Sequence, residues 1–153
     1  MATLTSTITE SLTLNGSQQG STNTKSITGI NAASKRMLTI TTNEATIATF
    51  SGAVGSAGHF NDGTVRYIRI TNLNASYFVC ITLKNGSNDE FAVKVDAGQS
   101  FVLFGDNSTG MELIFNATEN ADSATHTALG PLTSITADAE SGTIEIEMFV
   151  ATT

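Results

Sequence analysis

The sequence contains no tryptophan, one proline and one cysteine, and only 14% of its 153 residues are charged. Because Cys80 is the only cysteine, no disulfide can form within the chain, and a zinc site would need several further ligands. Seven Lys and Arg residues are scattered among 14 Asp and Glu residues, which gives a net charge of −7. Binding of nucleic acid needs clustered Lys and Arg side chains, so we expect no nucleic-acid partner.

Long apolar runs are also missing. No stretch approaches the roughly 20 apolar residues that a membrane-spanning helix needs. The N-terminus, MATLTSTITESLTL, lacks the basic start and the continuous apolar core of a signal peptide. These absences predict a protein that is made and folded in a cytoplasm and has no membrane partner.

Threonine and serine are abundant, with 25 and 15 residues respectively, and 40% of the chain is hydrophobic. Threonine is β-branched and its hydroxyl tolerates water, so it suits the solvent side of a sheet. A chain of 153 residues is long enough to bury one core. We therefore predict a single all-β domain that spans residues 1–153.

Alternating apolar and polar residues predict the strands of this domain. They fall at 36–42, 45–50, 64–72, 77–84, 90–95, 100–104, 111–116, 133–137 and 143–150. The four strands between 64 and 104 are separated by short polar turns, which predicts an antiparallel meander. The strand at 133–137 follows Pro131 and is expected at a sheet edge. The overall prediction is an antiparallel β-sandwich of eight to ten short strands, of the jelly-roll type.

The first 30 residues have a character of their own. Residues 1–14 alternate threonine with leucine or isoleucine, as a strand does, and Asn15-Gly16 is a strong turn signal. Residues 15–26 are polar without an apolar anchor, which predicts a loop. We expect residues 1–30 to form either an extended N-terminal arm or an edge strand.

Searching for catalytic motifs gives no positive result. The glycine-rich segment 51–63 predicts a bent surface loop, but it lacks the Lys-Ser or Lys-Thr of a phosphate-binding loop. It also lacks the Gly-x-Ser-x-Gly motif of a nucleophile elbow, because Val54 stands where the first glycine is needed before Ser56. His59 and His126 lie in different polar segments. We predict no enzyme and no cofactor, with a hydrolase built on one of these histidines as a third alternative.

Acidic residues are frequent in the predicted turns, where Asp62, Asp89, Asp96 and Asp106 occur with several asparagines. Oxygen-rich loops are what calcium requires, but Asp and Asn are also ordinary turn residues because they accept hydrogen bonds from nearby backbone amides. No segment has the spacing of an EF-hand loop. We therefore expect no metal site.

Sugar binding commonly uses exposed flat aromatic rings. The chain has no tryptophan, and its two tyrosines, Tyr67 and Tyr77, lie within predicted strands. These features count against a dedicated carbohydrate-binding module. A glycan- or receptor-binding module nevertheless remains an alternative function, with 52–63 and 105–110 as its candidate loops.

Four aromatic residues lie on the side of their predicted strands opposite the better-defined apolar face: Tyr67, Phe78, Phe104 and Phe149. Residues 101–104 are apolar on both sides of their strand, which predicts that both sides are covered. Large aromatic side chains are enriched in cores and in interfaces. Two interpretations therefore stay open: an interface with other subunits, anchored by these four residues, or a second face that the N-terminal strand covers within the domain.

The segment 65–105 resembles small β-sandwich structural proteins of tailed-bacteriophage virions. The resemblance rests on ITNLN (70–74) and DAGQSFVLF (96–104) and covers about a quarter of the chain. It implies a virion location after synthesis in the host cytoplasm, partners that are copies of the chain and other virion proteins, and neither catalytic residues nor a small-molecule substrate. The expected role is a capsid decoration (cement) protein, with a tail or head–tail connector component as the alternative within the particle.

Overall fold

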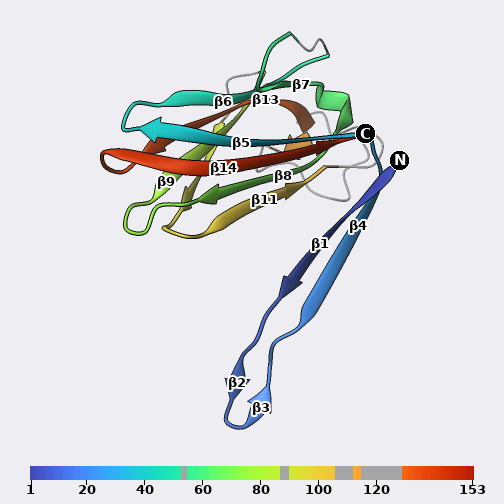
Figure 1. Cartoon of the computed structure of the whole chain (residues 1–153), viewed down its shortest axis with the longest axis vertical. Coiled ribbons are helices and arrows are strands. Elements are labelled where there is room, and N and C mark those ends of the chain that lie inside the picture. Colours follow the sequence, from blue (N-terminus) through green and yellow to red (C-terminus); the bar gives the residue numbers. More distant parts are fainter. Residues whose placement is uncertain (53–54, 87–89, 106–111, 115–128) are drawn as a thin grey trace.

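The structure is a computed structural model that describes residues 1–52, 55–86, 90–105, 112–114 and 129–153. In these residues every regular element is a β-strand except one short 3-10 helix, η1 (Asp62–Thr64). Two sheets pack face to face, and a long hairpin projects from them (Figure 1). The predicted all-β sandwich is confirmed.

The first sheet has four antiparallel strands in the order β11-β8-β14-β5. These are β11 (Ser100–Phe104), β8 (Val65–Asn72), β14 (Thr143–Thr152) and β5 (Ala32–Thr41). The last strand of the chain therefore lies between two strands from its first half, which makes this sheet a product of long-range pairing.

The second sheet has the order β10-β9-β13-β6-β7, and β12 pairs with the start of β13. Its strands are β10 (Glu90–Val95), β9 (Val79–Asn85), β13 (Leu129–Ala139), β6 (Ala45–Phe50), β7 (His59–Phe60) and β12 (Glu112–Ile114). Only β6 and β7 pair in parallel; the other described pairs are antiparallel. Strands β6, β10 and β11 have the bounds that the sequence predicted.

The main core lies between the two sheets, where alternate residues of each strand point inward. In β14 the inward residues Ile144, Ile146, Met148 and Val150 are at most 1% exposed, as the alternation predicted. The opposite sheet contributes Val79, Ile81, Leu83, Ile135 and Ala137. Burial of these aliphatic side chains supplies most of the stability of the sandwich.

Asn72 joins the two sheets through a buried polar contact. Its side chain is fully buried, and its Nδ2 donates to the backbone carbonyls of Tyr77 (2.9 Å) and Val95 (3.0 Å). Its Oδ1 accepts from the backbone N–H of Asn74 (2.9 Å). Since Val95 ends a strand of the opposite sheet, this amide ties the sheets together where water cannot replace it.

The predicted meander at 64–104 is wrong. Strand β8 pairs with β11, whereas β9 and β10 form a hairpin in the opposite sheet. The chain thus crosses between sheets after β8 and crosses back before β11. Alternation specifies which side chains point inward, but it is the same for a strand in either sheet, so it could not reveal this crossing.

Strand β13 also differs from the prediction. It is central, between β9 and β6, rather than an edge strand. Pro131 is tolerated because the pairing with β9 begins at Leu132 and that with β6 at Ser134, so Pro131 lies opposite Glu112 of β12 only. The described residues contain fourteen strands, more than the eight to ten predicted, and ten of them lie in the two packed sheets.

The N-terminal arm is a hairpin of β1 (Ala2–Thr9) and β4 (Thr22–Ile30), extended at its tip by β2 (Thr13–Leu14) and β3 (Ser17–Gln18) (Figure 1). The tip turns at Asn15-Gly16, where φ is 51° and 79°, as a tight hairpin turn requires. The predicted loop at 15–26 is therefore wrong in part. A strand with water on both sides needs no apolar alternation, so its sequence looked like that of a loop.

Candidate interaction surface

The outer face of the first sheet carries an aromatic cluster. The strand register places Tyr67 of β8 beside Phe104 of β11 and beside Ala151 of β14. The Tyr67 ring makes edge-to-face contacts with Phe104 (centroids 5.4 Å apart) and with Phe149 (6.0 Å). Such pairs stabilise beyond the area they bury. We call Tyr67, Phe104 and Phe149 the aromatic face.

Phe78, the fourth predicted interface residue, lies elsewhere. It immediately precedes β9, in the other sheet, and Lys94 Nζ sits 4.7 Å from its ring centroid. The sequence grouped Phe78 with Tyr67 and Phe104 because the predicted meander put their three strands in one sheet. The structure brings three of the four residues together and leaves Phe78 apart.

The base of the arm covers part of the aromatic face. Ile27 and Ile30 of β4 are 3% and 8% exposed and form a second apolar cluster with Tyr67 and Ala151. The side chains that pack against this cluster are Leu4, Val102 and Phe149. Of the two interpretations the sequence left open, cover within the domain applies to Tyr67, which is 6% exposed, but β4 provides most of that cover and the N-terminal strand contributes only Leu4. Phe104 remains 40% exposed. An interface role for the aromatic face stays a prediction.

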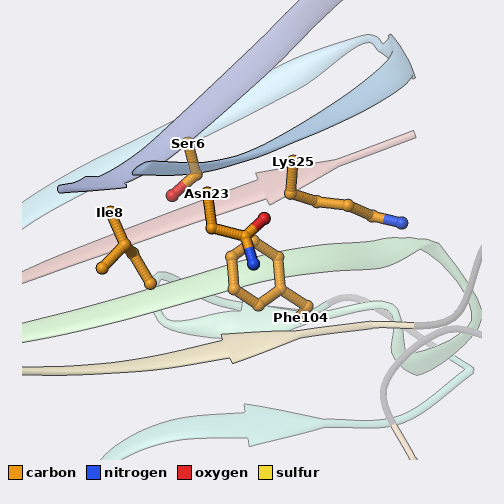
Figure 2. Close-up of a pocket in the computed structure, with 5 residues that line it drawn as sticks. All are labelled: Ser6, Ile8, Asn23, Lys25 and Phe104. Carbon is orange, nitrogen blue, oxygen red and sulfur yellow. The ribbon is translucent and has the colours of Figure 1, made fainter. Parts of the chain in front are cut away.

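A groove of about 340 Å³ lies between the arm and β11. Figure 2 shows its lining: Ser6 and Ile8 from β1, Asn23 and Lys25 from β4, and Phe104 from β11. Ile8 is 55% exposed. The groove is therefore an apolar slot with a polar rim, and Lys25 is the one charged residue among the described residues that line it.

A second groove, of about 330 Å³, follows the β1 side of the arm. Its lining joins β1 to the sheet and comprises Leu4, Thr5, Ser6, Thr7, Tyr67, Arg69 and Phe149. Two grooves thus lie where the arm meets the sheet, one mainly apolar and one of mixed polarity.

Next to the aromatic face lies an ionic cluster centred on Glu147. Lys35 Nζ is 2.7 Å from one carboxylate oxygen, and Arg69 Nη2 is 2.5 Å from the other. Hydrogen bonds from Lys35 and then from Arg69 hold the pKa of Glu147 below its ordinary value of 4.5. The cluster links β5, β14 and β8 and neutralises the carboxylate beside the apolar contacts.

One contact between a serine and a histidine was not foreseen from the sequence. His59 Nε2 lies 2.7 Å from Ser51 Oγ, because the parallel pairing of β7 with β6 brings the two segments together. A hydrolytic triad needs a carboxylate that orients the histidine, and in the part of the chain that the structure describes no carboxylate contacts His59. His126 lies outside the described residues. At Cys80, burial raises the pKa of the thiol, the opposite of what activates a nucleophile.

The acidic turn residues make local contacts. Asp62 Oδ1 accepts from the N–H of Gly63 (2.7 Å), and Asp96 pairs with Lys94 (2.7 Å). Asp89 and Asp106 lie outside the described residues. Within residues 1–52, 55–86, 90–105, 112–114 and 129–153, no group of three or more His, Cys, Asp or Glu side chains could hold a metal ion. The same residues contain no helix long and apolar enough to span a bilayer.

Comparison of the sequence with protein-family models and with curated proteins finds no match. Any functional conclusion therefore rests on the surface described above.

Proposed function

We propose that this chain is a non-enzymatic structural protein of a tailed-phage virion, and that it decorates the capsid. The observation that carries the proposal is the projecting arm, on which Ile8, Leu12 and Leu14 are each more than half exposed. A two-stranded hairpin is marginally stable in water by itself. Apolar side chains gathered on such a projection favour contact with another protein.

The strand order adds support, and we assign the sandwich to the jelly-roll type. Eight strands divide into β5-β14-β8-β11 and β6-β13-β9-β10, so that successive strands repeatedly change sheets. This arrangement is typical of two interleaved Greek keys, an architecture that viral capsid proteins and lectins use. Fold alone does not fix function, so the arm and the aromatic face remain the stronger argument.

Surface charge is compatible with assembly. Of the 14 acidic and seven basic residues, the arm contains only Glu10 and Lys25, so the net charge of −7 belongs to the rest of the chain. A neutral arm can approach another acidic subunit without like-charge repulsion, whereas the sandwich surfaces resist indiscriminate association.

Mass spectrometry of purified virions tests the proposal. We expect the protein in the particle, in a copy number in the hundreds, as a decoration protein on a closed shell requires. A copy number in the tens or fewer would indicate a tail or head–tail connector component instead. Absence from purified particles would refute the virion role altogether.

A second candidate function is glycan binding, and one groove favours it. This groove, of about 390 Å³, lies at the end of β9 and is lined by Lys84, Asn85, Gly86, Glu90, Thr133 and Ser134. Its polar lining could hydrogen-bond a sugar, although the described lining residues include no aromatic ring for stacking. Glycan arrays and calorimetry test this candidate: saturable binding that is lost in Lys84→Ala would support it, and no binding to any glycan would refute it.

A further inference from the structure

The middle and the tip of the arm have complementary surfaces. Midway along its length, the arm and β11 enclose the groove of about 340 Å³ described above, with Ile8 and Phe104 as its large apolar residues (Figure 2). At its tip, Leu12 and Leu14 are 55% and 56% exposed. An engineered apolar cavity of about 150 Å³ holds a benzene molecule, so the groove has room for leucine side chains.

The charges are complementary as well. Among the described residues that line the groove, Lys25 is the only charged one, and Glu10 is the only charged residue near the tip. Glu10 is held in place by the β-pairing at the tip: its N–H donates to the carbonyl of Ser21 (2.7 Å), and its carboxylate accepts from the Ser21 hydroxyl (3.1 Å). The Glu10 carboxylate therefore lies two residues from the apolar Leu12. Lys25 is placed in the same way at the rim of the apolar groove.

These surfaces cannot meet within one chain. Extended strands rise about 3.3 Å per residue, and the paired strands of the arm hold its tip away from its own base (Figure 1). We propose that the arm tip of one copy inserts Leu12 and Leu14 into the groove beneath the arm of a second copy, and that Glu10 pairs there with Lys25. The Asn15-Gly16 turn keeps the tip narrow enough to enter.

This contact joins different surfaces of two copies, so it is heterologous. Repeated, it closes into a ring or continues as a chain, according to the rotation between neighbours. The inference deepens the assembly part of the proposed function by naming the partner and the contact. It concerns copies of the chain in solution, so it can be tested separately from the virion location.

The first experiment measures self-association of the full chain by sedimentation velocity over a range of concentrations. Replacing Leu12 and Leu14 by Ser should raise the dissociation constant about tenfold or more for each leucine. Met37→Ser is the matched control, because Met37 is equally exposed (55%) but lies on the sandwich. Circular dichroism verifies that each variant keeps its fold, as expected for exposed positions.

Charge reversal is the second experiment. Glu10→Lys alone and Lys25→Glu alone should each weaken association, and the two substitutions together should restore it, since the opposite charges are then exchanged. A double variant that associates no better than the single variants would contradict the pairing of these two residues.

Cross-linking provides the third test, in a Cys80→Ala background. A protein with Leu14→Cys, mixed with one carrying Phe104→Cys, should form a disulfide-linked heterodimer under mild oxidation. Failure to cross-link, a wild-type chain that stays monomeric at every concentration, or leucine variants that associate like the wild type would overturn the proposal. Absence of the protein from virions, by contrast, would refute only the proposed location.

Discussion

Replacing Ile27 by Ala is expected to release the N-terminal arm and to leave the sandwich folded. Ile27 is 3% exposed and lies opposite Leu4 in the hairpin. It belongs to the second apolar cluster, which is separate from the main core. Full burial of an isoleucine contributes about 1.5–3 kcal/mol, so Ile27 and Ile30 together contribute about 3–6 kcal/mol to docking. Truncating one buried isoleucine to alanine costs about 2–5 kcal/mol, which is most of that sum.

Hydrogen–deuterium exchange of β1 and β4, measured together with thermal unfolding, separates local from global effects. A loss of 2 kcal/mol lowers the ratio of docked to undocked arm about 30-fold, so exchange in the arm should accelerate by at least about that factor. The melting temperature of the sandwich, followed by circular dichroism, should change by less than about 2 °C. Were arm and sandwich one cooperative unit, a loss of 2–5 kcal/mol would lower it by about 4–20 °C.

Thr28→Ala is the matched control, since Thr28 is the exposed neighbour of Ile27 in the same strand. It should change neither the exchange of the arm nor the melting temperature. Two results would refute the reasoning: unchanged exchange in Ile27→Ala, or a melting temperature lowered by more than about 4 °C.

Three further predictions concern the sandwich and its outer face. Asn72→Ala removes the fully buried amide that donates to the carbonyls of Tyr77 and Val95 and should lower the free energy of unfolding by about 2–4 kcal/mol; a loss below about 1 kcal/mol in urea titration would contradict its linking role. Glu147, whose pKa is lowered by Lys35 and then Arg69, contributes stability that is complete above pH 4.5 and is lost as the pH falls through the lowered pKa. Glu147→Gln should therefore flatten the acid side of a stability–pH profile, and a profile of unchanged shape would speak against this pairing. Phe149→Ser should weaken self-association while the sandwich stays folded, because the inward residues of β14 are untouched. Light scattering and thermal melting on one sample test this prediction. Unfolding of the variant would show Phe149 to be core, and normal assembly would show it to be ordinary surface.

The candidate surface was only partly predictable. The alternation of side chains along each strand correctly placed Tyr67, Phe104 and Phe149 on the outward side of their strands, which form one sheet face. Which side of a strand a residue occupies is a local property of that strand. Phe78 was grouped with them wrongly, since the sheet to which a strand belongs depends on long-range pairing. The grooves beside the arm had no sequence signal, because the arm and sheet residues that form their walls are about 60 to 145 residues apart.

The Ser51–His59 contact had no sequence signal either. Eight residues separate the two side chains, and they meet only because a two-residue strand pairs in parallel with β6. No spacing rule anticipates such a short parallel pairing, since parallel strands usually require a longer crossover.

The sequence by itself determined that the chain is all-β, where most strands of the sandwich lie and which side chains of a strand such as β14 point inward. Threonine-rich composition and period-two alternation are local, and they act on each strand before any partner is present. Tertiary structure alone decided which strands share a sheet, that residues 22–30 complete a projecting hairpin, and that this hairpin rests on Tyr67. Those outcomes depend on which apolar faces cover one another, and contacts between segments distant in the chain leave no local period to detect.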